Sequence, residues 1–453
     1  MIEKIINYTS FKNIFIYLVI FFLLYLIAWR LKNKDKFLSN NGFASLIIIF
    51  SFFVYFYDQF NFFEIKGTIF YGSFFTANDN YADLVKLLLS YKHIFTNSDL
   101  ELIGVPFGWI YSNPYSSIID GAVYNMHVPP FTTLINHLLA YVLVTTKVKL
   151  NNFIYLSILI FFIYGYKLLS KESNKSTILL FFLSFPSLFM FQRGNLVAGF
   201  CTLFLFKFII MSKQNNIPLI NKIIVLVLIS SFRPNYAIFL LLLIEKNNIK
   251  KSFKNIMFFV STFISFNILN LLLLKKLYPT YSISNFLKSV KIQTDWHLDF
   301  GDGFVSSNYR VIKSFFEITD YQDQRILQIL IFSILLIVAL TLSAMFFKNR
   351  LSLIEFSLCL YIISLTILNP IADYHLATSS LFIYLIYKYG DKDLKILLLV
   401  PLGILLIPKY HNNLLPDINY SLYFNNISLN LILFLIIQNL VTFKEIKSQY
   451  PDQ

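Results

Sequence analysis

Two carboxylates near the start of a polar stretch have the spacing of a catalytic pair. Asp79 and Asp83 lie four residues apart in segment 76–91, so a helix there would present both on one face. Leucines recur at helical spacing through this segment, which indicates an amphipathic helix at a membrane surface. Either carboxylate could act as a general base toward a hydroxyl nucleophile. The alternative is structural, with Asp79 capping the helix and Asp83 a solvated first-turn acid.

Two arginines interrupt apolar runs in the middle of the chain. Arg193 is followed by Gly194 and Asn195 between two such runs. Arg233 is followed by Pro234 inside a third run, where proline breaks the helix and a cation in hydrocarbon is costly. Because a guanidinium keeps its charge and forks onto phosphate oxygens, both arginines are predicted to bind a phosphate group. For Arg193, a loop cation is the alternative.

Other polar residues could complete a pocket around this phosphate. His127 ends the first long polar stretch and could reach the phosphate from the interface. A proline break in a late apolar run precedes Tyr374 and His375, which indicates a polar pocket wall. Asn195 is predicted to line the same pocket. Trp296, in the second polar stretch, could stack on an acceptor sugar, although a solvated loop is an equal alternative.

No residue pattern favours a metal or a disulfide. Asp295 with His297, and Asp373 with His375, each read Asp-x-His and could offer two ligands to a divalent ion. Two ligands make a weak signal, so no metal and no cofactor are predicted, while a divalent cation stays open. The two cysteines lie inside apolar runs and are predicted to be packing residues.

Composition sets the class of protein that must position these residues. The 453 residues are 57% apolar and 14% charged, whereas soluble domains are about 45–50% apolar and about 25% charged. Disordered chains, disulfide-stapled modules and ordinary cytosolic enzymes are thereby excluded. Apolar runs such as 14–28 and 326–347 do not alternate with polar residues, so a barrel is excluded and an all-α polytopic membrane protein is predicted. The net charge of +14 indicates lysines and arginines in cytoplasmic loops rather than nucleic-acid binding.

The apolar runs predict one integral membrane domain over residues 1–453, with roughly 11–13 transmembrane or re-entrant helices. Two long polar stretches, about 64–130 and 275–325, are predicted to be extracytoplasmic loops, the first carrying the interfacial helix. The candidate segments are 13–30, 43–60, 131–146, 152–168, 177–191, 195–211, 223–244, 256–274, 326–347, 352–368, 374–388, 396–409 and 428–443.

Loop charge leaves two topologies open. In the favoured one, segment 223–244 is a hairpin broken at Arg233-Pro234, and segment 131–146 is an interfacial helix that does not cross. The lysine clusters at 167–175, 213–222 and 246–254 are then all cytoplasmic. In the alternative, segment 223–244 crosses fully and the turn at 192–195 is cytoplasmic.

Acids at the outer surface with arginines in the membrane suit transfer from a donor linked to a lipid phosphate. These residues also resemble the GT-C membrane glycosyltransferases, and within them the family 87 group of polyprenyl-phosphate-hexose-dependent enzymes. Val128-Pro129-Pro130-Phe131 stands where this family often has Tyr-Pro-Pro-Leu, and Arg233-Pro234 where it usually has Lys-Pro. The further blocks, in the family's order, are Asp79-x-x-x-Asp83, Pro186 through Arg193-Gly194-Asn195, and Asn369-Pro370 with Tyr374-His375.

The resemblance implies an inverting transfer of a hexose, with mannose the first candidate, at the extracytoplasmic face of a bacterial inner membrane. It implies a polyprenyl-phosphate-sugar donor, a glycan or glycolipid acceptor, and Asp83 or Asp79 as the base. Two other functions stay open, a lipid-linked polysaccharide polymerase or ligase and a non-enzymatic polysaccharide or lipid transporter.

Overall fold

The computed structural model describes residues 44–45, 47–49, 51, 98, 129–173, 175–193, 195–214, 216–277, 283–284, 286–287, 308–316, 318–366, 373–389, 392–407 and 420–449. Among these residues the regular structure is helical, without strands. The chain divides into two compact units. We call Ala77–Leu168 with Met190–Phe300 the hairpin unit, and Met1–Thr76 with Leu169–Phe189 and Gly301–Gln453 the C-terminal unit.

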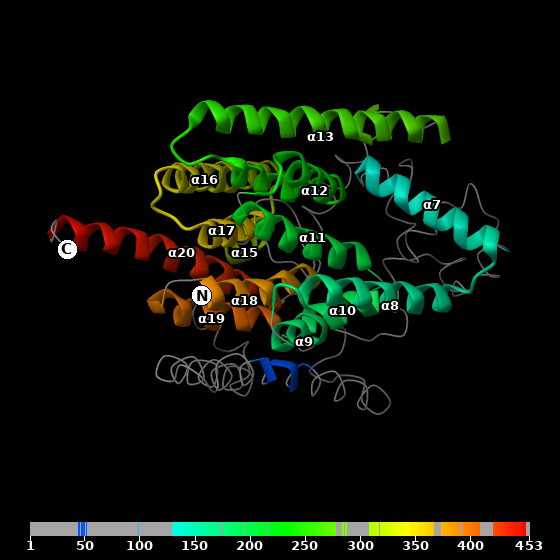
Figure 1. Ribbon diagram of the computed structural model, residues 1–453, viewed down its shortest axis with the longest axis horizontal. Helices are drawn as coiled ribbons and strands as arrows, with labels where there is room; N and C mark the ends of the chain where they lie inside the picture. Colours follow the sequence, from blue (N-terminus) through cyan, green and yellow to red (C-terminus); the bar gives the residue numbers. More distant parts are fainter. Residues whose placement is uncertain are drawn as a thin grey trace. The chain divides into compact units, whose positions relative to one another are not determined.

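The hairpin unit is built around aromatic packing between two parallel helices. Its helices are α7 (Pro130–Thr146), α8 (Leu150–Leu169), α11 (Leu196–Lys213), α12 (Leu219–Phe232), the 3₁₀ helix η3 (Pro234–Leu243) and α13 (Ile249–Leu277) (Figure 1). Phe161 and Tyr164 of α8 contact Phe200 of α11, with ring centroids 5.2 and 6.1 Å apart, and Tyr164 also contacts Phe204. The later residue of α8, Tyr164, thus reaches a later residue of α11, Phe204, than Phe161 does. Helices α8 and α11 therefore run in the same direction.

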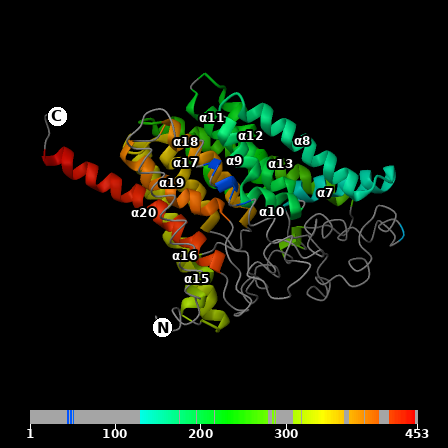
Figure 2. The ribbon, with the colours of Figure 1, turned by 90° about the horizontal axis from the view of Figure 1, so that it is seen from below.

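The C-terminal unit has two central helices that are buried all round. It contains α9 (Lys175–Leu183), α15 (Asn308–Phe315), α16 (Tyr321–Phe347), α17 (Leu353–Thr366), η4 (Asp373–Ala377), α18 (Thr378–Tyr389), α19 (Lys392–Leu406) and α20 (Tyr420–Gln449). Helices α17 and α18 lie among α9, α16, α19 and α20 (Figure 2). Tyr361 stacks on Phe382 with ring centroids 5.1 Å apart. An apolar helix without a polar face is expected at such a position.

Several element boundaries differ from the apolar pattern. Predicted segment 177–191 is two helices, α9 and α10 (Phe185–Arg193), which meet at Ser184. Helix α16 begins at Tyr321 rather than at 326, because the Asp320 carboxylate accepts hydrogen bonds from the backbone of Gln322 and Asp323. The predicted second loop contains α15, whose Tyr309 is buried and donates to Gln324 at 3.2 Å.

Four helices in the described part of the chain are long and apolar enough to cross a membrane. They are Asn152–Leu169 within α8, then α11, α13 and α16. The prediction of an all-α membrane protein is confirmed at this level, while the helix number and the GT-C-like arrangement stay predictions. Cys201 and Cys359 are both buried free thiols, as predicted for packing residues.

Gly199 allows α8 and α11 to approach closely. A Cβ at this position would lie 2.7 Å from two ring carbons of Phe161 and 2.8 Å from the Met190 sulfur. Both neighbours are fully buried. We therefore expect Gly199→Ala to lower the free energy of unfolding by about 1–3 kcal/mol, measured by denaturation of the purified protein in detergent.

A double variant separates this clash from a loss of flexibility. Phe161→Leu combined with Gly199→Ala should lose less stability than the two single variants together, because the smaller side chain vacates the space. Additive losses would contradict the steric explanation.

Candidate functional site

Arg233 stands at the tip of a helical hairpin. Helix α12 ends there, and Arg233 itself is extended, with φ −141° and ψ 96°, before η3 begins at Pro234. Proline lacks an N–H, so the Ser230 carbonyl, four residues earlier, loses its helical donor. We call Arg233-Pro234 the hairpin tip. The opposite end, where Lys222 and Glu245 lie, is the hairpin base.

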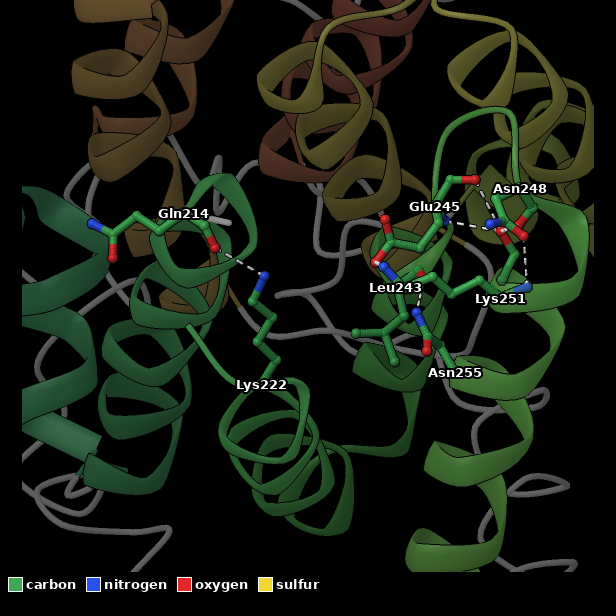
Figure 3. Close-up of polar contacts among 8 residues, drawn as sticks. Gln214, Lys222, Leu243, Glu245, Asn248, Lys251 and Asn255 are labelled. Carbon is green, nitrogen blue, oxygen red and sulfur yellow. Dashed lines mark hydrogen bonds and ion pairs between the residues drawn. The ribbon is translucent and has the colours of Figure 1, made fainter. Parts of the chain in front are cut away.

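Contacts at the hairpin base show that η3 folds back along α12. The Lys222 ammonium donates to the Gln214 carbonyl at 3.1 Å and lies within electrostatic range of Glu245 (Figure 3). In a straight helix, 23 residues would separate Lys222 from Glu245 by about 35 Å. Helices α12 and η3 also pack against each other. The backbone therefore folds back at Arg233-Pro234, as the favoured topology requires, while the topology in the membrane stays a prediction.

Helix α13 runs along the hairpin from base to tip. At the base, Asn255 donates to the Leu243 carbonyl at 3.1 Å, and Glu245 forms an ion pair of 3.1 Å with Lys251 (Figure 3). Near the tip, Asn267 donates to the Ser231 hydroxyl at 3.2 Å. The exposed ion pair contributes little to stability, so the amide contacts and apolar packing hold α13 in place.

The first turn of α7 closes over the hairpin tip. The Thr132 hydroxyl shares its single proton between the carbonyls of Ser231 and Phe232, at 3.4 and 3.2 Å. Phe131 packs edge-on against Phe232 and Phe266, with centroids 4.7 and 5.0 Å away. Thr132 therefore supplies a donor for carbonyls that the break at Pro234 leaves without helical partners.

The spacing of lysines along α13 gives the depth of the tip. Lys254 and Lys275 flank an apolar stretch of about 30 Å, the thickness of a bilayer's hydrocarbon core. Asn267, which contacts the tip, lies about 20 Å from Lys254 along this helix. The tip thus lies about two-thirds of the way along the apolar stretch, on the side of Lys275.

Asn195 and Arg233 belong to the same end of the hairpin unit. Helix α10 ends at Arg193, and the Asn195 side chain caps α11 by accepting from the Ala198 N–H at 3.3 Å. Arg233 lies within electrostatic range of Cys201, which is about 9 Å along α11 from Asn195. The structure therefore shows a capping role for Asn195, and its predicted pocket role stays a prediction.

The predicted late break belongs to the C-terminal unit. His375 is buried in η4, and its carbonyl accepts a hydrogen bond of 3.0 Å from the Tyr361 hydroxyl. Tyr361 also lies 3.3 Å from the Ser379 hydroxyl. A buried Tyr361 thus fixes the backbone at the break. For Tyr374 and Arg193 the structure describes the backbone alone.

Several predicted residues lie outside the described residues, namely Asp79, Asp83, His127 and Trp296. In the ranges described, no group of three or more His, Cys, Asp or Glu side chains could hold a metal. The sequence interpretation missed Thr132 and Asn267, whose only signal was a polar residue inside an apolar helix.

Comparison with known proteins gives no match, whether with protein-family models, curated proteins or solved structures. The likeness to GT-C glycosyltransferases therefore stays a resemblance of sequence blocks.

The hairpin can be tested by cross-linking. In a variant whose two native cysteines are replaced by alanine, Lys222→Cys and Glu245→Cys should be joined by a short bismaleimide, because both lie at the hairpin base. The matched pair Lys222→Cys and Ile268→Cys should remain unlinked, since Ile268 lies on the exposed face of α13 near the tip. Mass spectrometry of the digested protein would identify the links. The reverse pattern would show a straight helix.

Proposed function

We propose that this protein transfers a hexose, with mannose the first candidate, from a polyprenyl-phosphate donor to a glycan or glycolipid acceptor. The transfer takes place at the extracytoplasmic face of a membrane, which in a bacterium is the inner membrane. It inverts the configuration at the anomeric carbon and uses no resident cofactor. The observation that carries the proposal is Arg233 at the tip of the hairpin, within the apolar depth of the unit.

A phosphate on a lipid suits this position. An arginine at such a depth is costly unless it meets an anion or water. A phosphate attached to a hydrocarbon chain can approach from within the bilayer, because its tail stays in lipid throughout. The N-termini of α7 and η3 both lie at the tip, and the positive ends of their dipoles favour an anion there.

The charges at the hairpin base indicate that this end faces the cytoplasm and that the hairpin tip faces outward. Five lysines stand at this end, on α11, on α12, in the turn before α13 and at the start of α13: Lys213, Lys222, Lys246, Lys250 and Lys251. By the positive-inside rule this end faces the cytoplasm. The predicted loop that carries Asp79 and Asp83 precedes α7 in the sequence, and the first turn of α7 contacts the carbonyls beside the tip. A carboxylate from this loop that acts as the general base would then lie on the same side of the membrane as the phosphate.

Replacing Arg233 tests the donor site. Arg233→Ala should weaken binding of polyprenyl-phosphate-mannose by about 10- to 100-fold, the worth of a hydrogen-bonded charge contact of about 1.5–3 kcal/mol. Arg233→Lys should recover part of the affinity, because a point charge replaces a forked one. Lys222→Ala, at the hairpin base, is the matched control and should bind as wild type. Equal donor affinity in wild type and Arg233→Ala would reject the site.

The predicted base is tested separately from binding. Asp83→Asn or Asp79→Asn, whichever removes the true base, should lower the transfer rate by about 10²- to 10⁴-fold, and the double variant should do so in either case. Donor affinity should be retained, because the amide is isosteric and the arginines are untouched. Transfer of radiolabelled mannose to an acceptor-containing membrane extract measures the rate. An unchanged rate in the double variant would exclude both residues as the base.

A further inference from the structure

The 3₁₀ helix η3 is unusually long. It runs for ten residues, Pro234–Leu243, whereas 3₁₀ runs longer than about three or four residues are uncommon, because their hydrogen-bond geometry is poorer than that of an α-helix. Hydrogen bonds of three-residue spacing stand at both ends. The Tyr236 N–H donates to the Arg233 carbonyl at 3.0 Å, and the Ile244 N–H donates to the Leu241 carbonyl at 3.3 Å. The winding of this segment therefore requires an explanation.

Side-chain burial in η3 follows the same winding. Tyr236, Phe239 and Leu242 are buried at intervals of three residues, and side chains with this spacing lie on one face of a 3₁₀ helix. In an α-helix the same three positions would spread over about 120° of the circumference. The rings of Tyr236 and Phe239 are in contact, with centroids 6.1 Å apart. Because η3 packs against both α12 and α13, this packing favours the 3₁₀ winding.

Helix α13 contacts the hairpin at two levels that match the length of η3. Asn255 donates to the Leu243 carbonyl at the base (Figure 3), and Asn267 donates to the Ser231 hydroxyl near the tip. These two amides are twelve residues apart, about 18 Å along α13. The nine steps from Pro234 to Leu243 cover about 18 Å in a 3₁₀ helix but only about 14 Å in an α-helix. An α-helical η3 would therefore be about 4 Å too short to keep both contacts.

The hydrogen bonds at the hairpin base are shorter than those near the tip. Both backbone groups of Glu245 bond the Ser252 hydroxyl, at 2.9 and 3.1 Å, and the Asn255 contact is 3.1 Å long. The contacts of Asn267 and Thr132 near the tip are 3.2–3.4 Å long, further from the preferred distances of about 2.7–3.0 Å. Moving Glu245 into the apolar layer would also be costly. If η3 shortens, the tip therefore moves and the base stays.

We propose that η3 is a length-adjustable segment that sets the depth of Arg233 in the apolar layer. As a 3₁₀ helix it holds Arg233 outward, as in this structure, and as an α-helix it draws the hairpin tip about 4 Å toward the base. The α-helical form has better backbone hydrogen bonds, whereas the outward form keeps the arginine closer to the membrane surface. The consequence for donor binding rests on the proposed function, because the outward form presents Arg233 to the lipid phosphate.

Spin-label distances in the full-length protein in nanodiscs test this movement. With the two native cysteines replaced by alanine, labels at Asn235→Cys next to the tip and Lys250→Cys at the base report the position of the tip along α13. Ser231→Ala removes the hydroxyl that Asn267 contacts and should populate a second distance about 4 Å shorter. Ser230→Ala is the matched control and should keep the wild-type distance, because the buried Ser230 hydroxyl makes no hydrogen bond in the described part of the chain.

A variant on the other side of this contact separates the movement from a folding defect. Asn267→Leu removes the same hydrogen bond from α13 and should shorten the same distance. Asn270→Leu is its control and should not, since the buried Asn270 amide donates to the Phe266 carbonyl of its own helix, at 2.7 Å. An unchanged distance in both Ser231→Ala and Asn267→Leu would overturn the inference, and so would equal shortening in the two controls.

Donor binding connects the winding of η3 to the proposed function. Polyprenyl-phosphate-mannose should restore the longer distance in Ser231→Ala, because a ligand that binds only the outward form shifts the population toward it. Its apparent Kd should rise over that of wild type by the inverse of the outward fraction measured without donor, about twofold at equal populations. Wild-type affinity in Ser231→Ala without a change in distance would overturn the coupling. A wild type that binds no donor would reject the proposed function, while the shortened distance would still establish the adjustable length.

Discussion

A helix that stops inside an apolar layer must find donors for its last carbonyl groups, and this constraint organises the hairpin unit. Pro234 cannot donate to α12, and the extended backbone of Arg233 turns the chain away from the helix. Unsatisfied carbonyls in hydrocarbon cost several kcal/mol each. The Thr132 hydroxyl reaches two of them, and Asn267 joins α13 to the same turn. The places of α7 and α13 follow from where these donors are required.

The same constraint links the fold to the proposed chemistry. Polar groups that satisfy a helix break create a polar environment at a depth that is otherwise apolar. An arginine can be retained there, and a phosphate can be recognised by both its charge and its geometry. The hairpin base differs, because its Glu245–Lys251 ion pair is exposed and its lysines contribute mainly to orientation in the membrane.

Much of the secondary structure could be predicted from the sequence because apolar runs and prolines act locally. The apolar run after Lys254 lies in the long helix α13. Segment 223–244 breaks at Arg233-Pro234 as expected. Helix boundaries that depend on a single side chain were harder to predict from the sequence. The start of α16 depends on the Asp320 cap, and the break between α9 and α10 falls at Ser184, two residues before Pro186. Both lie within stretches whose average hydropathy gives no sign of them.

By itself the sequence determined the class of protein and the position of the hairpin tip, because composition and proline chemistry act without long-range contacts. Which residues meet was decided only by the tertiary structure. Thr132 and Phe232 are 100 residues apart, and only packing of α7 against the hairpin brings them together. Hydrogen-bond partners between distant helices depend on their register, which is set by the fit of side chains across the interface.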